Sequence, residues 1–228
     1  MNTELYYEEY GYGFPLILLH GNGEDHTYFA HQIEYFKDRY RVIALDTRGH
    51  GRSPRGDGDF TIKRFSDDLY DFMIAHGISS ADLLGFSDGG NIALTFALKH
   101  PDMVRSLVLN GANLDPSGVK RSVQFPIELG YRIASKAAKK SAGARRNSEM
   151  LGLMVNEPHI TPGELEKLDI PVLVIAGTRD MIKREHTELI AASIPGARLA
   201  IIRGDHFVAR KVPGSFNRAV DSFLKEKL

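Results

Sequence analysis

The chain has 228 residues, 43% of them hydrophobic, and its 29 basic and 29 acidic residues give a formal net charge of zero. This length and apolar content suit one domain with a continuous core, and the neutral balance gives no overall electrostatic case for binding nucleic acid or an anionic membrane surface. The absence of cysteine excludes disulfides and thiolate metal sites, and no apolar run approaches the ~20 residues that span a bilayer.

The opening residues are too polar for a signal peptide, so we expect a cytoplasmic protein. Residues 4–10 are predicted to form a strand that pairs antiparallel at a sheet edge. Further strands are predicted at 15–19, 41–45, 81–86, 104–110, 171–176 and 197–202, and helices near 26–37, 62–76, 89–99, 183–194 and 214–226. This alternation predicts an α/β protein with a mostly parallel sheet covered by helices on both faces.

A serine flanked by glycines lies between the predicted strand 81–86 and the predicted helix 89–99, where the chain reads Gly-Phe-Ser-Asp-Gly-Gly. The pattern alone is weak, because glycine and serine are common in turns. At a sharp strand-to-helix turn, however, a serine adopts strained backbone geometry that side chains at Gly85 and Gly89 would obstruct. Ser87 is therefore a candidate nucleophile.

A serine nucleophile needs a base, and the base needs a group that orients it. The predicted strand 171–176 leads into Asp180, and the strand 197–202 leads into His206. Each candidate therefore follows a strand, in the chain order Ser87, Asp180, His206.

This order of residues resembles the α/β-hydrolase superfamily, and the resemblance spans nearly the whole chain. The sequence His-Gly-Asn-Gly at 20–23 looks like the family's oxyanion loop, and Asp-Thr-Arg-Gly-His-Gly-Arg-Ser at 46–53 is similar to its D-x-R-G-x-G-x-S turn. Together with the Ser-Asp-Gly-Gly elbow, the first loop looks most like the biphenyl-hydrolase-like and amino-acid-ester-hydrolase group. Some relatives carry the acid after the preceding strand, where Asn113 and Asp115 lie here.

Roughly 60 residues without a predicted strand follow the strand 104–110, which is far longer than an ordinary connection. In this family such an insertion is a cap, so we expect a core of residues 1–111 and 170–228 with a helical cap at 112–169. Residues 115–147 carry eight basic side chains against two acidic ones. We interpret them as a solvated helix face, the alternative being attraction of an anionic substrate group.

Apolar cap residues are the expected wall of an acyl pocket, although ordinary packing would also explain most of them. They are Phe125, Ile127, Leu129, Tyr131, Met150, Leu151, Leu153 and Met154. The cap sets substrate choice, which the sequence leaves open.

The resemblance implies that His206 accepts the proton of Ser87 while Asp180 holds the imidazole. The backbone amides of Asn22 and Asp88 are the expected donors to the oxyanion. This chemistry needs no cofactor and no metal.

The side chain of Asp88 has two interpretations. It caps a helix, or, with Glu24 or Asp25, it receives a cationic substrate group such as the α-amino group of an amino-acid ester. Both His20 and His50 lie in Gly-rich loops and are interpreted as structural.

The sequence therefore predicts a serine hydrolase that cleaves small carboxylic-type esters through an acyl-enzyme. A peptidase, a C–C bond hydrolase or a perhydrolase would use the same triad, and a ligand-binding protein without useful turnover is the alternative from another class. The expected partner is a small ester-like molecule, with neither nucleic acid nor membrane. Monomer and dimer are equally open.

Overall fold

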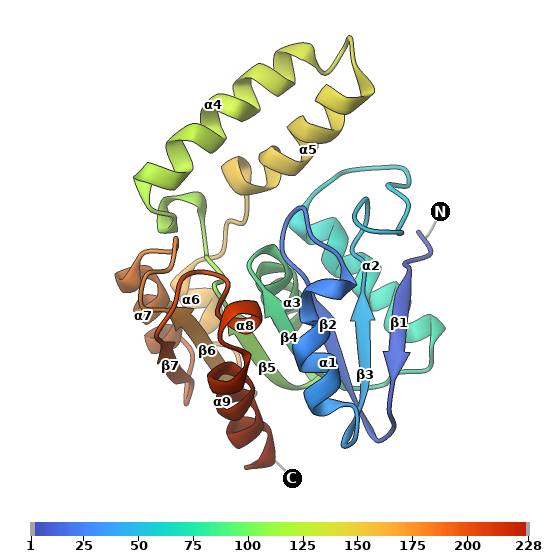
Figure 1. Ribbon diagram of the computed structural model, residues 1–228, viewed down its shortest axis with the longest axis vertical. Coiled ribbons are helices and arrows are strands. Elements are labelled where there is room, and N and C mark those ends of the chain that lie inside the picture. Colours follow the sequence, from blue (N-terminus) through green and yellow to red (C-terminus); the bar gives the residue numbers. More distant parts are fainter. Residues whose placement is uncertain (1–2, 227–228) are drawn as a thin grey trace.

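The computed structural model describes residues 3–226 and has one seven-stranded sheet with helices on both faces (Figure 1). The strands are β1 (Tyr7–Tyr10), β2 (Phe14–Leu19), β3 (Tyr40–Leu45), β4 (Ala81–Phe86), β5 (Val104–Asn110), β6 (Val172–Gly177) and β7 (Arg198–Ile202). Their order is β1-β3-β2-β4-β5-β6-β7, and only β1 is antiparallel to its neighbour. The predicted α/β class, the parallel sheet and the antiparallel edge strand are confirmed.

The helices cover the two sheet faces in separate groups. They are η1 (His26–Phe29), α1 (Ala30–Phe36), α2 (Ile62–Ala75), α3 (Asp88–Lys99), η2 (Pro101–Met103), η3 (Pro116–Gly118), α4 (Arg121–Ala137), α5 (Ala142–Asn156), α6 (Pro162–Leu165), α7 (Arg184–Ser193), α8 (Val208–Lys211) and α9 (Pro213–Lys225), the η elements being 3-10 helices. Apolar side chains of α1, α8 and α9 pack on one face of the sheet, and those of α2, α3, α6 and α7 pack on the other. Burial of apolar side chains on both faces explains why the strands are nearly continuous hydrophobic runs.

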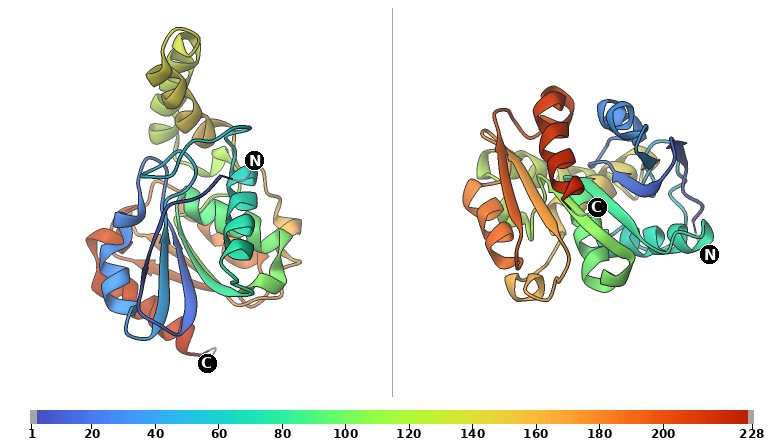
Figure 2. Two further views of the ribbon diagram at one scale, coloured as in Figure 1. Left: turned by 90° about the vertical axis from the view of Figure 1, so that its right-hand side faces the viewer. Right: turned by 90° about the horizontal axis from the view of Figure 1, so that it is seen from below.

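Two helices of the predicted cap project from the body. The hairpin of α4 and α5, residues 121–156, rises above the carboxyl ends of the parallel strands, and we call it the α4–α5 arm (Figures 1 and 2). Towards its end the insertion joins the body, because Leu153 at the end of α5 is buried in the main core, as are Leu165 and Leu168. The division into a core and a cap of residues 112–169 stays a prediction.

Candidate active site

Ser87 lies directly after β4, the central strand, and directly before α3. Among residues 3–226 it is the only non-glycine residue with a positive φ, at 52°, and its side chain is half-buried. A Cβ on Gly85 would lie 2.2 Å from the carbonyl oxygen of Gly89, and one on Gly89 would lie 2.0 Å from that of Leu19. The two glycines are therefore required by close backbone contacts, and the turn has the strained geometry of a nucleophile elbow.

His206 and Asp180 meet at the same edge of the sheet. The Nδ1 of His206 lies 2.6 Å from Oδ1 of Asp180, and both residues are at least 95% buried. The ring of Phe86, the residue before Ser87, lies 4.8 Å from the imidazole, measured between centroids. Because β4, β6 and β7 are parallel, the three predicted catalytic residues follow carboxyl ends that lie along one edge.

The backbone around Asp180 fixes the position of its carboxylate. The amides of Gly177 and Ile182 donate to its two oxygens at 3.1 and 3.0 Å. Burial by itself would raise the pKa of Asp180, but the hydrogen bond and charge of His206, together with these amides, lower it below its usual value. An ionised carboxylate in this position holds the proton of the imidazole on Nδ1 and leaves Nε2 free to act as a base.

The alternative position for the triad acid, at Asn113 and Asp115, is occupied by side chains with other partners. Asp115 caps η3 and accepts a hydrogen bond from the amide of Ser117, and the imidazoles whose charges lower its pKa are those of His186 and His159 rather than His206. The side chain of Asn113 is engaged with Asn91. Of the two acid positions considered from the sequence, only Asp180 contacts His206.

The two predicted oxyanion donors have free amides. Within residues 3–226, neither the amide of Asn22 nor that of Asp88 donates a hydrogen bond to another protein group. Asp88 is the first residue of α3, where amide groups have no partner inside the helix. Preorganised donors of this kind suit an oxygen that gains negative charge during the reaction.

The side chain of Asp88 is buried rather than displayed at the mouth of the site. It is 8% exposed, and its carboxylate accepts hydrogen bonds from the side-chain amides of Asn22, at 2.9 Å, and Asn91, at 3.4 Å. Burial raises the pKa of Asp88 to about 6, although the two amides and His206 oppose this shift. A cationic substrate group would have to reach this carboxylate past Asn22.

Glu24 contacts the segment that follows His206. One of its carboxylate oxygens is 3.4 Å from Arg210 of α8, and the other is buried without a hydrogen-bond partner. Burial raises the pKa of Glu24 to about 7, while Arg210 and His206 act in the other direction. The hydroxyl of Tyr28 is also buried without a partner, and its ring stacks on Phe86 at 4.4 Å.

Three of the apolar cap residues expected to form the pocket wall, Phe125, Tyr131 and Met154, occupy different environments. Phe125 is 57% exposed on α4, with the guanidinium of Arg121 5.3 Å from its ring centroid. Tyr131 packs toward Gly152 between α4 and α5, and the carbonyl of Met154 accepts a hydrogen bond from Gln124. Phe125 is therefore largely open to solvent, Tyr131 packs within the arm, and Met154 contacts Gln124 through its backbone carbonyl.

Two cavities border the arm, and Ser87 lines neither. One, of about 300 Å³, lies between α5 and the 49–60 loop and includes Arg55, Arg145 and Arg146. The other, of about 640 Å³, lies between α2, α3 and the end of α5. Of these three arginines, Arg145 and Arg146 belong to the basic segment of the cap, whereas Arg55 is paired with Glu149 at 2.8 Å. An anionic substrate group, the alternative considered above, would meet Arg145 and Arg146 in this cavity.

The Gly-rich loops are held together by their polar side chains. The Nε2 of His20 accepts a hydrogen bond from the amide of Thr47 at 3.0 Å, which ties the oxyanion loop to the turn after β3. Burial lowers the pKa of His20 and brings that of His50 to about 4, so both imidazoles are neutral near pH 7. Arg48 is fully buried and binds both carboxylate oxygens of Asp68 at 2.6 Å.

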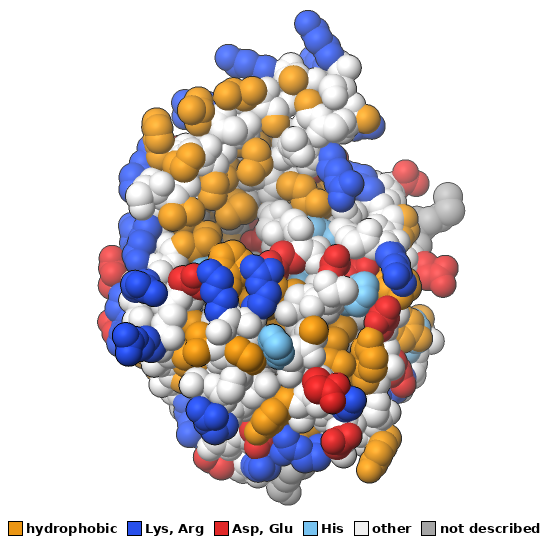
Figure 3. Space-filling view, viewed as in Figure 1, with side chains coloured by type: hydrophobic (Ala, Val, Ile, Leu, Met, Phe, Trp, Pro, Cys, Tyr) orange, Lys and Arg blue, Asp and Glu red, His pale blue; other side chains and the backbone are white. Residues whose placement is uncertain are grey.

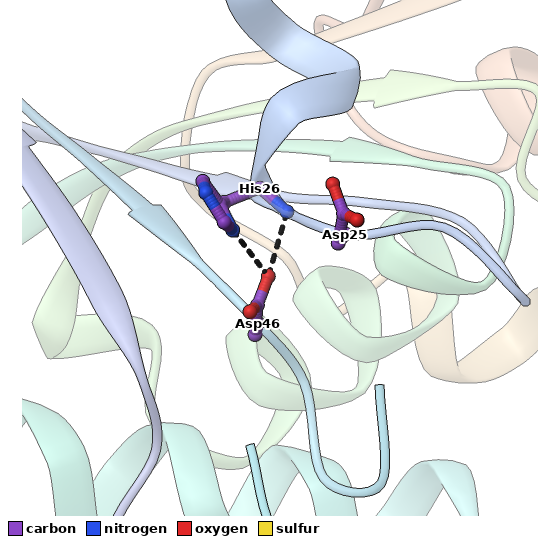
Figure 4. Close-up of side chains that lie close together, drawn as sticks. All are labelled: Asp25, His26 and Asp46. Carbon is purple, nitrogen blue, oxygen red and sulfur yellow. Dashed lines mark hydrogen bonds and ion pairs between the residues drawn. The ribbon is translucent and has the colours of Figure 1, made fainter. Parts of the chain in front are cut away.

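A second cluster of titratable groups joins Asp25, His26 and Asp46 (Figure 4). Their ligand-type atoms lie within 4.8 Å of one another, so the cluster has the dimensions of a metal site. One oxygen of Asp46 accepts from the amide and from Nδ1 of His26, at 2.7 and 2.8 Å, and its other oxygen accepts from the amide of Arg52. These bonds explain the cluster as a brace between loops.

Sequence reasoning missed several contacts that hold the site. The side chain of Asn22 donates to Asp88 and also to the carbonyl of Met150 on α5, at 2.8 Å. The ammonium group of Lys120 donates to the carbonyl of Asp180 at 2.5 Å. These contacts join residues 60 to 128 positions apart, and no local pattern signals them.

No helix within residues 3–226 is long and apolar enough to cross a membrane.

A parallel sheet with a strained serine turn at its centre and a His–Asp pair at the same edge defines a hydrolase of the α/β-hydrolase fold. Residues 15–129 match the family model described as alpha/beta hydrolase fold. The chain is 30% identical over 247 residues to the mouse serine hydrolase BPHL, covering 98% of this chain and 84% of the relative. The chain therefore belongs to the α/β-hydrolase family, and its similarity to BPHL supports the biphenyl-hydrolase-like group.

Two further relatives extend this similarity. The chain is 26% identical over 253 residues to the (E)-2-((N-methylformamido)methylene)succinate hydrolase of Acinetobacter baylyi, covering 98% of this chain and 95% of that one. A solved structure of a thermophilic esterase from Thermogutta terrifontis, with malate bound, superposes with a TM-score of 0.83 at 25% identity, covering 99% and 94% of the two chains. The family and its named members establish this protein as a hydrolase.

Proposed function

We propose that this hydrolase cleaves small carboxylic-type esters through an acyl-enzyme on Ser87. The observation that carries the proposal is the buried His206–Asp180 pair, 2.6 Å apart, at the same sheet edge as a serine held at a φ of 52°. Strained backbone at this position is costly, and it persists where the surrounding structure imposes it for a function.

The geometry suggests a division of roles. His206, with its Nδ1 held by Asp180, takes the proton of the Ser87 hydroxyl as that oxygen attacks the acyl carbon. The amides of Asn22 and Asp88 donate to the carbonyl oxygen as it becomes negative, each donor contributing on the order of 3 kcal/mol. The imidazolium then gives its proton to the leaving alcohol, and water releases the acid in a second cycle with His206 as base.

The same residues would serve a peptidase, a C–C bond hydrolase or a perhydrolase, and these remain the alternatives. A serine at the elbow speaks against mechanisms that need a carboxylate nucleophile. An amino-acid ester is the more specific candidate, because Asp88 adjoins the nucleophile. Recognition of its ammonium group requires Asn22 to turn away from the carboxylate, since Asn22 now donates to it at 2.9 Å.

The test is hydrolysis of p-nitrophenyl esters from acetate to octanoate, together with aminoacyl esters, by wild type and Ser87→Ala. We expect serine-dependent turnover with a burst of p-nitrophenol, and a loss of about 10⁴-fold or more in kcat for Ser87→Ala. Equal product release by the two proteins would contradict the proposal.

The Asp88→Asn variant separates the two substrate classes in the same assay. If Asp88 receives an ammonium group, the ratio of kcat/KM for aminoacyl over neutral acyl esters falls in this variant. An unchanged ratio would remove Asp88 from substrate recognition and leave simple ester hydrolysis in place.

A further inference from the structure

The α4–α5 arm carries an apolar stripe that no part of the described chain covers. Phe125, Leu129 and Ile133 are 57%, 51% and 63% exposed, and their spacing of four residues places them on one face of α4. Figure 3 shows hydrophobic side chains along the arm on the viewer's side. Three of the eight large hydrophobic residues exposed within residues 3–226 lie on this single helix. Adjacent exposed apolar side chains are a common feature of interaction surfaces.

The arm carries seven basic side chains, and all of them are exposed: Arg121, Arg132, Lys136, Lys139, Lys140, Arg145 and Arg146. The first three share α4 with the stripe, Lys139 and Lys140 follow its end, and the last two lie on α5 beside the 49–60 loop. The two acidic residues of the arm are neutralised, since Glu128 pairs with Arg121 at 2.6 Å and Glu149 with Arg55 at 2.8 Å. Because the whole chain has a formal charge of zero, the body must carry the balancing negative charge. The molecule is therefore strongly asymmetric in charge, with the arm as its positive end.

We propose that the arm docks on an anionic lipid surface, independently of the proposed esterase activity. An exposed stripe of Phe, Leu and Ile beside Lys and Arg is the composition of a helix that lies in a membrane interface. Long basic side chains reach anionic headgroups while their aliphatic stems and the apolar stripe enter the acyl boundary. Docking of the arm would depart from the expectation, drawn from the neutral whole chain, that membranes play no part.

Charge also favours a lipid surface over a second copy of the arm as the partner of the stripe. Two arms packed stripe to stripe would bring two sets of basic residues together with no unpaired acid to offset them. An anionic surface instead satisfies both the charge and the apolar stripe. Since the arm rises from the edge that carries Ser87 and His206, docking would bring that edge toward the lipid (Figure 1).

The experiment is flotation of the full chain with vesicles of phosphatidylcholine alone or mixed with phosphatidylserine. We expect binding only to the anionic vesicles, decreasing as salt is raised because surface charge is screened. The double variants Leu129→Gln/Ile133→Gln and Arg132→Glu/Lys136→Glu should each lower the bound fraction by about tenfold. Circular dichroism and thermal melts establish that both variants are folded.

The matched controls place the same changes on the body. Ile74, 57% exposed on α2, is changed to Gln, and the exposed pair Lys63 and Arg218 is changed to Glu. These variants should float like wild type, and so should Ser87→Ala, which separates docking from catalysis. The proposal is overturned if wild type binds neither vesicle, binds both equally, or binds as well after the arm changes as before. If wild type is a dimer and the Leu129→Gln/Ile133→Gln variant is a monomer, the stripe packs against a second copy of the chain instead.

Discussion

The catalytic edge of the sheet and the α4–α5 arm are built in opposite ways. At the edge, Asp180 is 97% buried and its two oxygens accept hydrogen bonds from two amides and one imidazole. On the arm, the large side chains of the outer face are more than half exposed. Side-chain hydrogen bonds from the Gly-rich loops reach the arm at Met150 and Glu149, and Arg146 reaches back to the carbonyl of Gly49 at 3.5 Å.

Under the two proposals above, this contrast separates the residues that would carry out the chemistry from those that would contact a lipid surface. Proton transfer and oxyanion stabilisation require atoms held within fractions of an ångström, which a buried pair such as His206 and Asp180, bonded to the backbone, provides. A surface that meets a substrate or a lipid can instead vary in composition as long as it stays exposed. Changes at the edge should therefore be costly, and equivalent changes on the arm should be mild.

The largest effect is expected at the triad acid. Asp180→Asn would replace one oxygen by an NH₂ group, which cannot accept from the amides or from His206, and the imidazole would lose its orientation. We expect kcat to fall by about 10³- to 10⁴-fold with the fold retained. Steady-state kinetics with Asp115→Asn as the matched control check this, because Asp115 is the acid that does not contact His206. A reversed outcome, in which Asp115→Asn is the inactive variant, would move the acid to the loop after β5.

Substitutions of Arg48 and Arg121 allow a buried ion pair to be compared with an exposed one. Arg48→Leu leaves Asp68, 2% exposed, without its bidentate partner and with only the partly exposed Arg64 at 3.3 Å, so we expect about 3 kcal/mol to be lost from the free energy of unfolding. Arg121→Leu removes an ion pair whose arginine side chain is 69% exposed, and the expected change is within about 0.5 kcal/mol. Denaturant unfolding of both variants measures the difference. Similar losses in the two proteins would show that the arm is as tightly coupled as the body.

Asp88 gives a smaller effect that depends on pH. Burial raises its pKa from 3.8 to about 6, so the folded state binds more protons than the unfolded state between these values. Stability attributable to Asp88 is therefore lost as pH rises through this window, on the order of 2–3 kcal/mol above pH 6. Asp88→Asn should be more stable than wild type above about pH 6, with the difference disappearing near pH 4. Thermal melts of wild type and Asp88→Asn across this pH range measure the difference, with the exposed Asp59→Asn as control. If the stability of the two proteins changes with pH in parallel, burial of Asp88 does not raise its pKa.

Local patterns in the sequence were sufficient to predict the strands of the sheet and to place Ser87, Asp180 and His206 after the ends of three of them. Strands such as β4 and β6 are short apolar runs ended by glycine or a polar turn, and these signals depend only on neighbouring residues. The requirement for Gly85 and Gly89 was likewise readable, because a serine between a strand and a helix leaves no room for a Cβ. The expected helix at 26–37 is instead a 3-10 turn followed by α1, a difference at the level of one turn.

By itself, then, the sequence determined the fold class, the order of the strands along the chain and the segments that present Ser87, Asp180 and His206. Only the tertiary structure decided that Asp180 rather than Asp115 meets His206, that Asn22 covers Asp88, and that Glu24 faces Arg210. It also decided that the basic and apolar residues of α4 share an exposed surface. The physical reason is that periodicity and glycine act within a few residues, whereas burial, pKa and exposure are set by groups that the chain brings together from distant positions.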